Sequence, residues 1–262
     1  MVKNIYLSKQ EQMVFNVISS SDIVYTDEID DIFPSLLPNQ INKICHSLSS
    51  KGHLYRLKKG TYMVQKKPSD LPIIKNPYRI ASALFKGYIG FSTALRLYDL
   101  IDYEPFTIFI VTENKSAEKI IGEYTFKSVA MGKKASGMTY YKDVYISTIA
   151  KTFFDCFYKP QYGGGYSTIT KALHDADIVW DEFLDHFDFA SSSLCQRTGY
   201  ILELLSQEAD KIPEEVLQYF RKRIKNNTKL LQSGSGKGTY IKRWMLLDNL
   251  GKENILSWWY HG

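Results

Sequence analysis

Seven basic residues and no acidic residue lie between Phe33 and Ser69, in a window whose pattern also predicts a helix followed by a β-hairpin. The basic residues are Lys43, Lys51, Arg56, Lys58, Lys59, Lys66 and Lys67. The acidic stretch from Asp27 to Asp31 comes just before this window, so the sign of the charge changes abruptly within one small region. A basic helix and hairpin are what a winged-helix module presents to a duplex, so DNA is the first partner we expect.

Capping and periodicity predict three helices before the hairpin. Ser8 and Glu11 have the spacing of a capping box, which predicts the start of the first helix. Thr26 begins a short second helix that reaches about Ile32. Asn39 can cap a third helix, which Gly52 ends. The apolar residues of this third helix share one face and are Ile41, Ile44, Cys45 and Leu48.

The runs Leu54–Leu57 and Thr61–Val64 flank a turn at Lys58-Lys59-Gly60 and predict the hairpin. Three helices and then a hairpin is the order of a winged helix-turn-helix. The polar face of the third helix suits contact with base edges, and the basic hairpin suits contact with phosphates. The alternatives are a solvated helix face in a module that contacts protein, and an ordinary solvated turn. The predicted DNA-binding residues are Asn39, Asn42, Lys43, His46, Ser50, Arg56, Lys58 and Lys59.

The segment from Gln65 to Pro77 contains three lysines and three prolines and is predicted to be a linker. We therefore expect a winged-helix domain over residues 1–70 and a second domain over residues 71–262. Strands are predicted over 106–112, 124–130 and 139–146, and helices over 92–97, 147–157, 167–176, 193–207 and 213–225. The fold class predicted for the whole chain is α+β, with the winged helix followed by a mixed α+β C-terminal domain.

Composition restricts the class of protein without identifying it. The chain has 262 residues, 44% of them hydrophobic and 23% charged, with a net charge of +5. The three isolated cysteines, Cys45, Cys156 and Cys195, are typical of reduced thiols. The N-terminus lacks the apolar core of a signal peptide, and no run of about 18 apolar residues occurs. We therefore expect a cytoplasmic protein with no membrane partner.

No motif predicts catalysis strongly. Gly236-Lys237 lacks the glycine and the hydroxyl residue of a phosphate-binding loop, and the tracts 163–165 and 233–238 are predicted to be loops. The five histidines show no spacing of metal ligands. Asp102, Glu113 and Lys115 do have residue types that nucleases use around Mg²⁺. We predict no enzyme activity, no metal and no cofactor, with a DNA-targeted nuclease as the less favoured alternative.

Five segments, taken in order, resemble one family. Leu48–Tyr62 is similar to the end of the recognition helix and the wing of the AbiEi antitoxins of type IV toxin–antitoxin, or abortive-infection, systems. Ser92–Leu97, Ile146–Cys156 (which continues into Lys159-Pro160 and Gly163-Gly164) and Gln196–Glu203 are similar to landmarks of that family's C-terminal region. Arg243-Trp244 resembles its closing strand. The single motifs are degenerate, and their order is the specific part.

The resemblance implies a winged helix that binds operator DNA to repress its own operon, and a C-terminal domain that counteracts a nucleotidyltransferase-like toxin. It supplies no catalytic residues and leaves open whether antitoxin and toxin touch. The chain departs from the family at Tyr98-Asp99, where His-Gly is usual. A stand-alone transcriptional regulator is the alternative. From the residues alone we expect Phe153 and Phe154 in the core and Asp155 holding a nearby backbone group or an arginine.

Overall fold

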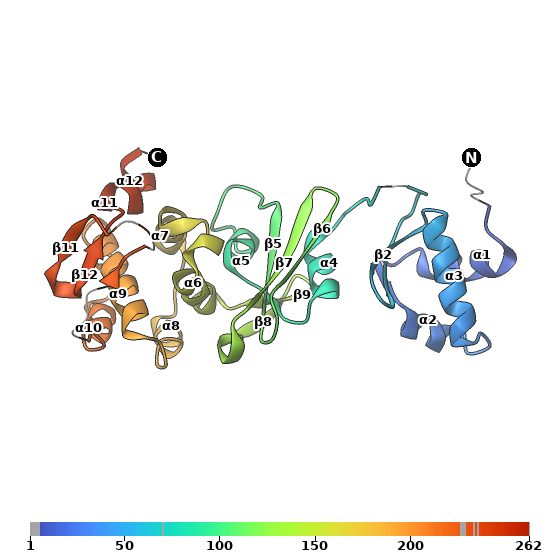
Figure 1. Ribbon diagram of the computed structural model, residues 1–262, viewed down its shortest axis with the longest axis horizontal. Helices are drawn as coiled ribbons and strands as arrows, with labels where there is room; N and C mark the ends of the chain where they lie inside the picture. Colours follow the sequence, from blue (N-terminus) through green and yellow to red (C-terminus); the bar gives the residue numbers. More distant parts are fainter. Residues whose placement is uncertain (1–5, 70, 226–228, 233, 235, 262) are drawn as a thin grey trace. The chain divides into compact units, whose positions relative to one another are not determined.

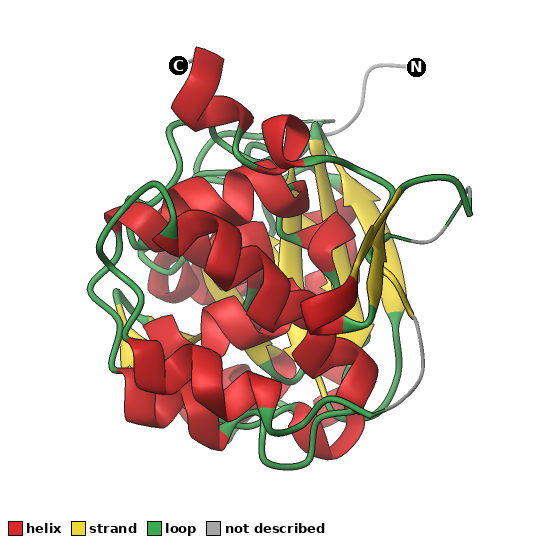
Figure 2. Cartoon of the chain, turned by 90° about the vertical axis from the view of Figure 1, so that its left-hand side faces the viewer, coloured by secondary structure: helices red, strands yellow, loops and turns green. Residues whose placement is uncertain are grey.

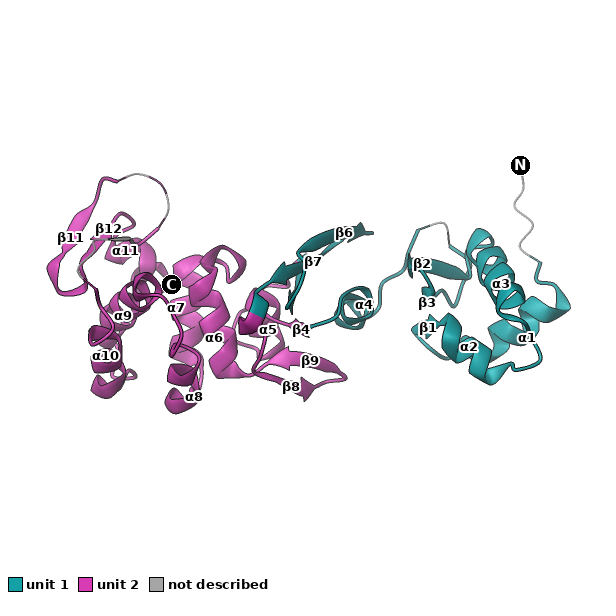
Figure 3. Cartoon of the chain, turned by 60° about the horizontal axis from the view of Figure 1, so that its bottom comes forward, with its two compact units in different colours: residues 1–87, 106–132 teal, residues 88–105, 133–262 magenta. Residues whose placement is uncertain are grey.

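The computed structural model describes residues 6–69, 71–225, 229–232, 234 and 236–261 (Figure 1). It is a mixed α+β chain in which more residues are helical than are in strands (Figure 2). Contacts divide the chain into two compact units (Figure 3). Unit 1 contains residues 1–87 and 106–132, and unit 2 contains residues 88–105 and 133–262. The predicted α+β class is confirmed.

The N-terminal part of unit 1 consists of three helices and a small antiparallel sheet. Its elements are α1 (Lys9–Ile18), β1 (Ile23–Tyr25), α2 (Thr26–Ile32), α3 (Pro38–Ser50), β2 (Leu54–Lys58) and β3 (Thr61–Val64). The strand order is β1–β3–β2, and both pairs are antiparallel. The apolar side chains of the helices meet the sheet in one core, which includes Val14, Ile29, Ile41, Leu48, Leu54 and Tyr62.

The predicted elements of this part are present, with two differences. The Ser8–Glu11 capping box starts α1, as expected. The prediction that Asn39 caps α3 is wrong, because Leu37 is the capping residue and the side chain of Gln40 accepts a hydrogen bond from its N–H. The strand β1 was not expected, because three residues are too few to show an alternating pattern.

The rest of unit 1 packs one helix against strands. These elements are α4 (Pro77–Leu84), β5 (Thr107–Thr112), β6 (Ala117–Ile121) and β7 (Tyr124–Ala130). Strand β5 runs parallel to β7, β6 runs antiparallel to β7, and α4 packs on β5. The predicted linker ends where Asn76 caps α4 with its side chain. Within it, the buried Gln65 accepts a hydrogen bond from the Ile73 N–H. The domain boundary at residue 70 stays a prediction.

Unit 2 begins with strands and continues as helices. Its larger elements are β4 (Tyr88–Ile89), α5 (Phe91–Leu97), β8 (Met138–Tyr141), β9 (Val144–Ser147), α6 (Ile149–Tyr158), α7 (Gly165–Asp175), α8 (Trp180–Asp185), α9 (Ser192–Ser206) and α10 (Glu214–Arg221). Strand β9 pairs in parallel with β4 and antiparallel with β8. The single strand predicted over 139–146 is wrong, because Lys142 and Asp143 have positive φ angles and form the turn of a hairpin.

A small sheet and two short helices end the chain. They are β10 (Lys229–Leu230), β11 (Thr239–Ile241), β12 (Leu246–Asp248), α11 (Lys252–Ile255) and α12 (Ser257–His261). Arg243 and Trp244 lie in the 3-10 helix η3 (Lys242–Trp244), so their assignment to a closing strand is wrong. Of the tract 233–238, residues 233 and 235 lie outside the described residues, and the others are in neither helix nor strand. No helix within the described ranges is long and apolar enough to cross a membrane.

A charged pair lies in the interior of unit 2. The side chains of Lys151 and Asp155 on α6 are 1% and 0% exposed, and their ammonium and carboxylate groups are in contact. The Tyr88 hydroxyl donates to the other carboxylate oxygen of Asp155 at 3.2 Å. The expected partner of Asp155, a backbone group or an arginine, is therefore wrong. Burial raises the pKa of Asp155 to about 6, even though Lys151 and Tyr88 act to lower it. Phe153 and Phe154 are buried, as predicted.

Candidate nucleic-acid interface

Helix α3 has one buried face and one polar exposed face. Ile41, Ile44, Cys45 and Leu48 are buried in the core of the N-terminal part, as their spacing predicts. The residues predicted to contact DNA from this helix are all exposed, and their spacing of three or four residues places them on the side away from that core: Asn39, Asn42, Lys43, His46 and Ser50. The fold therefore brings all five onto one solvent-facing surface.

Four of these side chains are available to a ligand. Over the described ranges, no side chain or backbone group hydrogen-bonds or pairs with the side chains of Asn39, Asn42, Lys43 and His46. The Ser50 hydroxyl, by contrast, donates to the His46 carbonyl at 3.0 Å within the same helix. Asn39, Asn42 and Lys43 together supply two amides and one ammonium group for hydrogen bonds to an external partner.

The hairpin of β2 and β3 closes at Lys58-Lys59-Gly60. Gly60 has a φ of +70°, and a Cβ there would lie 2.9 Å from Thr26 Oγ1. The Gly60 carbonyl accepts from the Thr26 N–H at 3.0 Å, which fixes the turn to the start of α2. Lys59 is exposed at this turn and has no partner within the described part of the chain. It is the hairpin cation best placed to reach a phosphate.

The hairpin is tied to the rest of unit 1, whereas the Arg56 side chain is exposed. The Lys58 ammonium donates to the Leu84 carbonyl at the end of α4 at 3.2 Å. Lys119 on β6 donates to the Leu57 carbonyl, so the hairpin is held at two points. Burial lowers the pKa of Lys119, and the positive charge of Arg56 lowers it further. Sequence patterns do not predict these two contacts, because they join residues 26 and 62 positions apart.

One basic residue of the window is neutralised within the protein. The Lys51 ammonium lies 2.7 Å from the Glu11 carboxylate, which links the end of α3 to the start of α1. Burial alone would raise the pKa of Glu11, but hydrogen bonds from Lys51, Ser47 and Ser8 bring it down to about 2. The pair stays ionised near neutral pH, so Lys51 adds little positive charge to the surface of α3.

The residues considered for nuclease chemistry have separate environments. The Asp102 carboxylate, in unit 2, pairs with Lys171 at 2.7 Å. Glu113 and Lys115 are exposed beyond the end of β5 in unit 1. Across the residues that the structure describes, no group of three or more His, Cys, Asp and Glu side chains could hold a metal ion. The three cysteines are buried and free.

Comparison with known proteins adds no assignment, because neither the models of protein families nor the curated proteins contain a match to this chain. The resemblance to the AbiEi antitoxins therefore depends on the five sequence segments from Leu48–Tyr62 to Arg243-Trp244 and stays a prediction.

Proposed function

We propose that this protein is an antitoxin of a type IV toxin–antitoxin system that regulates its own transcription. Its N-terminal part acts as a winged helix that binds operator DNA, and its C-terminal region counteracts a nucleotidyltransferase-like toxin. The observation that carries the DNA-binding part is the exposed face of α3. There Asn39, Asn42 and Lys43 project from a helix whose other face is held in a compact core.

The chemistry of this face matches the edges of bases. An asparagine amide can pair with adenine through two hydrogen bonds, and a lysine can donate to guanine or to a phosphate. The buried contacts of Ile41 and Leu48 keep α3 from rotating, so these groups stay directed to one side. Lys59 at the hairpin turn would contact the phosphate backbone and hold the register of the helix on the duplex.

The binding can be measured by fluorescence anisotropy with duplex DNA from upstream of the gene. Asn42→Ala or Lys43→Ala should weaken binding to the cognate duplex by about 1 to 3 kcal/mol and binding to unrelated duplexes much less. Lys59→Ala should weaken all duplexes alike and make the affinity less sensitive to salt. Lys9→Ala removes one exposed charge from α1 and is the matched control. Equal losses in Lys9→Ala and Lys43→Ala would contradict this use of α3.

The antitoxin part rests on the order of the resembling segments in unit 2. A cut at residue 70 would separate groups that hold unit 1 together, including Lys119 and the Leu57 carbonyl. Variants of the full chain are therefore the better test. A protein with both Asn42→Ala and Lys43→Ala should lose repression but still rescue growth when the neighbouring toxin is expressed from an unrelated promoter. If rescue is lost as well, neutralisation depends on DNA binding, and our division of roles is wrong.

The neighbouring gene separates this proposal from a stand-alone regulator. A nucleotidyltransferase-fold protein encoded directly downstream supports the antitoxin. If the adjacent genes encode no such protein, the regulator becomes the better description, and the DNA-binding proposal for α3 is unchanged.

A further inference from the structure

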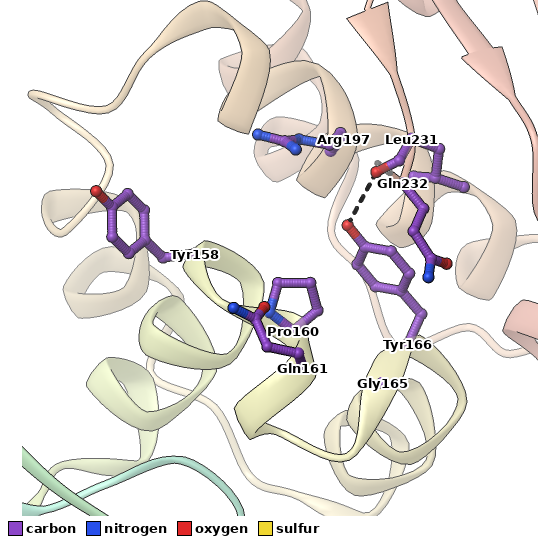
Figure 4. Close-up of a pocket in the computed structure, with 8 residues that line it drawn as sticks. All are labelled: Tyr158, Pro160, Gln161, Gly165, Tyr166, Arg197, Leu231 and Gln232. Carbon is purple, nitrogen blue, oxygen red and sulfur yellow. Dashed lines mark hydrogen bonds between the residues drawn. The ribbon is translucent and has the colours of Figure 1, made fainter. Parts of the chain in front are cut away.

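A cavity of about 460 Å³ in unit 2 has no role in the function proposed above (Figure 4). Its wall comes from five segments: the end of α6, the 3-10 helix η2 (Pro160–Tyr162), the start of α7, helix α9 and the residues after β10. The side chains that matter are Tyr158, Gln161, Tyr166, Arg197, Leu231 and Gln232. The volume falls within the range of roughly 300 to 1,000 Å³ that is usual for small-molecule sites.

Arg197 gives this cavity a positive charge that no described residue neutralises. Its Nε donates to the Ser193 carbonyl at 3.1 Å, which orients the guanidinium group. No carboxylate within the described ranges pairs with it, and no acidic residue lines the cavity. Arg221 and Arg223 of the same unit pair with carboxylates instead. In Figure 4, the Arg197 side chain extends from α9 toward the side on which Tyr158 lies.

Further cations stand beside the cavity. The ammonium groups of Lys134 and Lys159 lie 5.4 and 5.7 Å from the centre of the Tyr158 ring. Tyr158 is itself 39% exposed, so part of its surface is open to a ligand. Positive charge on this side of the cavity, with no acid in the lining, selects for an anionic group. An arginine with free terminal nitrogens can hold a phosphate through two hydrogen bonds.

The remaining wall can contact a planar ligand that has polar groups along its edge. The Tyr166 hydroxyl is occupied, because it donates to the Leu231 carbonyl at 3.3 Å, and this bond fixes the ring in the wall (Figure 4). The side-chain amides of Gln161 and Gln232 have no partner in the described part of the chain. Amides of this kind can donate to and accept from the edge of a base, while tyrosine rings pack against its faces.

We propose that this cavity binds a nucleoside monophosphate. Arg197 holds the phosphate, Tyr158 packs against the base, and Gln161 and Gln232 hydrogen-bond to its polar edge. Inorganic phosphate alone would leave most of the cavity unfilled, and an uncharged nucleoside would leave the charge of Arg197 without an anionic partner. The site should therefore distinguish a nucleotide from each of its two parts.

Isothermal titration calorimetry of the full chain tests the proposal with the four common ribonucleoside 5′-monophosphates, their parent nucleosides and inorganic phosphate. At least one monophosphate should bind saturably, and its nucleoside and inorganic phosphate should each bind at least about tenfold more weakly. Arg197→Gln should weaken the binding by about 10- to 100-fold. Lys142→Gln removes an exposed positive charge of unit 2 away from this lining and should leave the binding unchanged.

Gln161→Trp is a second variant that does not depend on the charge. Gln161 is exposed, so the larger side chain is tolerated by the fold but fills part of the cavity, and binding should be lost. Melting curves test whether each variant is folded. If Arg197→Gln does not fold, the binding measured with Gln161→Trp tests the proposal. The proposal is overturned if no monophosphate binds at millimolar concentration, if phosphate alone binds as tightly, or if binding survives in Gln161→Trp.

Discussion

The buried pair of Lys151 and Asp155 should be sensitive to the loss of either charge. Both side chains are almost fully shielded from water, so neither ion can be rehydrated when its partner is removed. Removing one member of such a pair typically costs about 3 to 5 kcal/mol, which is a large share of the roughly 5 to 15 kcal/mol that stabilises a folded domain. Lys151→Met should therefore destabilise unit 2 by about this amount, because among the described residues the Asp155 carboxylate keeps only the Tyr88 hydroxyl as a partner.

Replacing both charges should cost much less than the sum of the single changes. In the double variant Lys151→Met with Asp155→Leu no unpaired ion is left, so most of the penalty disappears. Lys171→Met is the matched control, because Lys171 also forms a short ion pair, with Asp102, but on the surface. An exposed pair of this kind contributes about 0 to 1 kcal/mol.

Urea denaturation followed by tryptophan fluorescence measures these differences directly. All four tryptophans lie in unit 2, so the signal reports the unfolding of this unit. An unfolding free energy of Lys151→Met within about 1 kcal/mol of that of the unchanged protein would contradict a stabilising role of the pair. A loss no larger than that of Lys171→Met would contradict it as well. Additive losses in the double variant would show that the two charges do not stabilise each other.

Three further predictions concern a titrating carboxylate, a close-packed glycine and a helix cap. The pKa of Glu11 is lower in the folded chain than its usual 4.5, because Lys51, Ser47 and Ser8 hydrogen-bond to its carboxylate. These bonds should therefore stabilise the N-terminal part above pH 4.5 and be lost as the pH falls toward 2. Hydrogen exchange of α1 should show this loss, and Glu11→Gln should remove the pH dependence. Gly199→Ala should lower the melting temperature of unit 2, because the added Cβ would lie 2.3 Å from the buried Trp244 ring. This clash costs about 2 kcal/mol and outweighs the gain in helix propensity of about 1 kcal/mol. Ser8→Ala should destabilise the N-terminal part by about 1 kcal/mol in thermal melts, because the cap of α1 is lost, and an unchanged melting temperature would contradict a role for that cap.

Features that depend on neighbouring residues could be predicted from the sequence. The capping box of Ser8 and Glu11 joins groups three residues apart, and the apolar stripe of α3 repeats at the helical period. The hairpin of β2 and β3 has a glycine at its turn that adopts a positive φ angle. The candidate DNA-binding face follows from the same pattern, because burying one side of α3 exposes the other.

Turns without a glycine were harder to predict. Lys142 and Asp143 both adopt positive φ angles, which such residues rarely do, so the chain from Thr139 to Ile146 has the pattern of one strand. Helix α4 was not predicted, because the prolines before it indicate a linker. Pro77 in fact occupies the first turn of this helix, where proline is well tolerated.

Contacts between distant residues were decided by the tertiary structure alone. The sequence determined the helices and the hairpin of the N-terminal part, because caps, periodicity and turns act over a few residues. It could not show that Lys58 reaches the Leu84 carbonyl, that Lys51 is neutralised by Glu11, or that Arg197 faces a cavity without an acid. Whether a charged side chain is paired, buried or free depends on which surfaces the folded chain brings together, and local patterns carry no information on that.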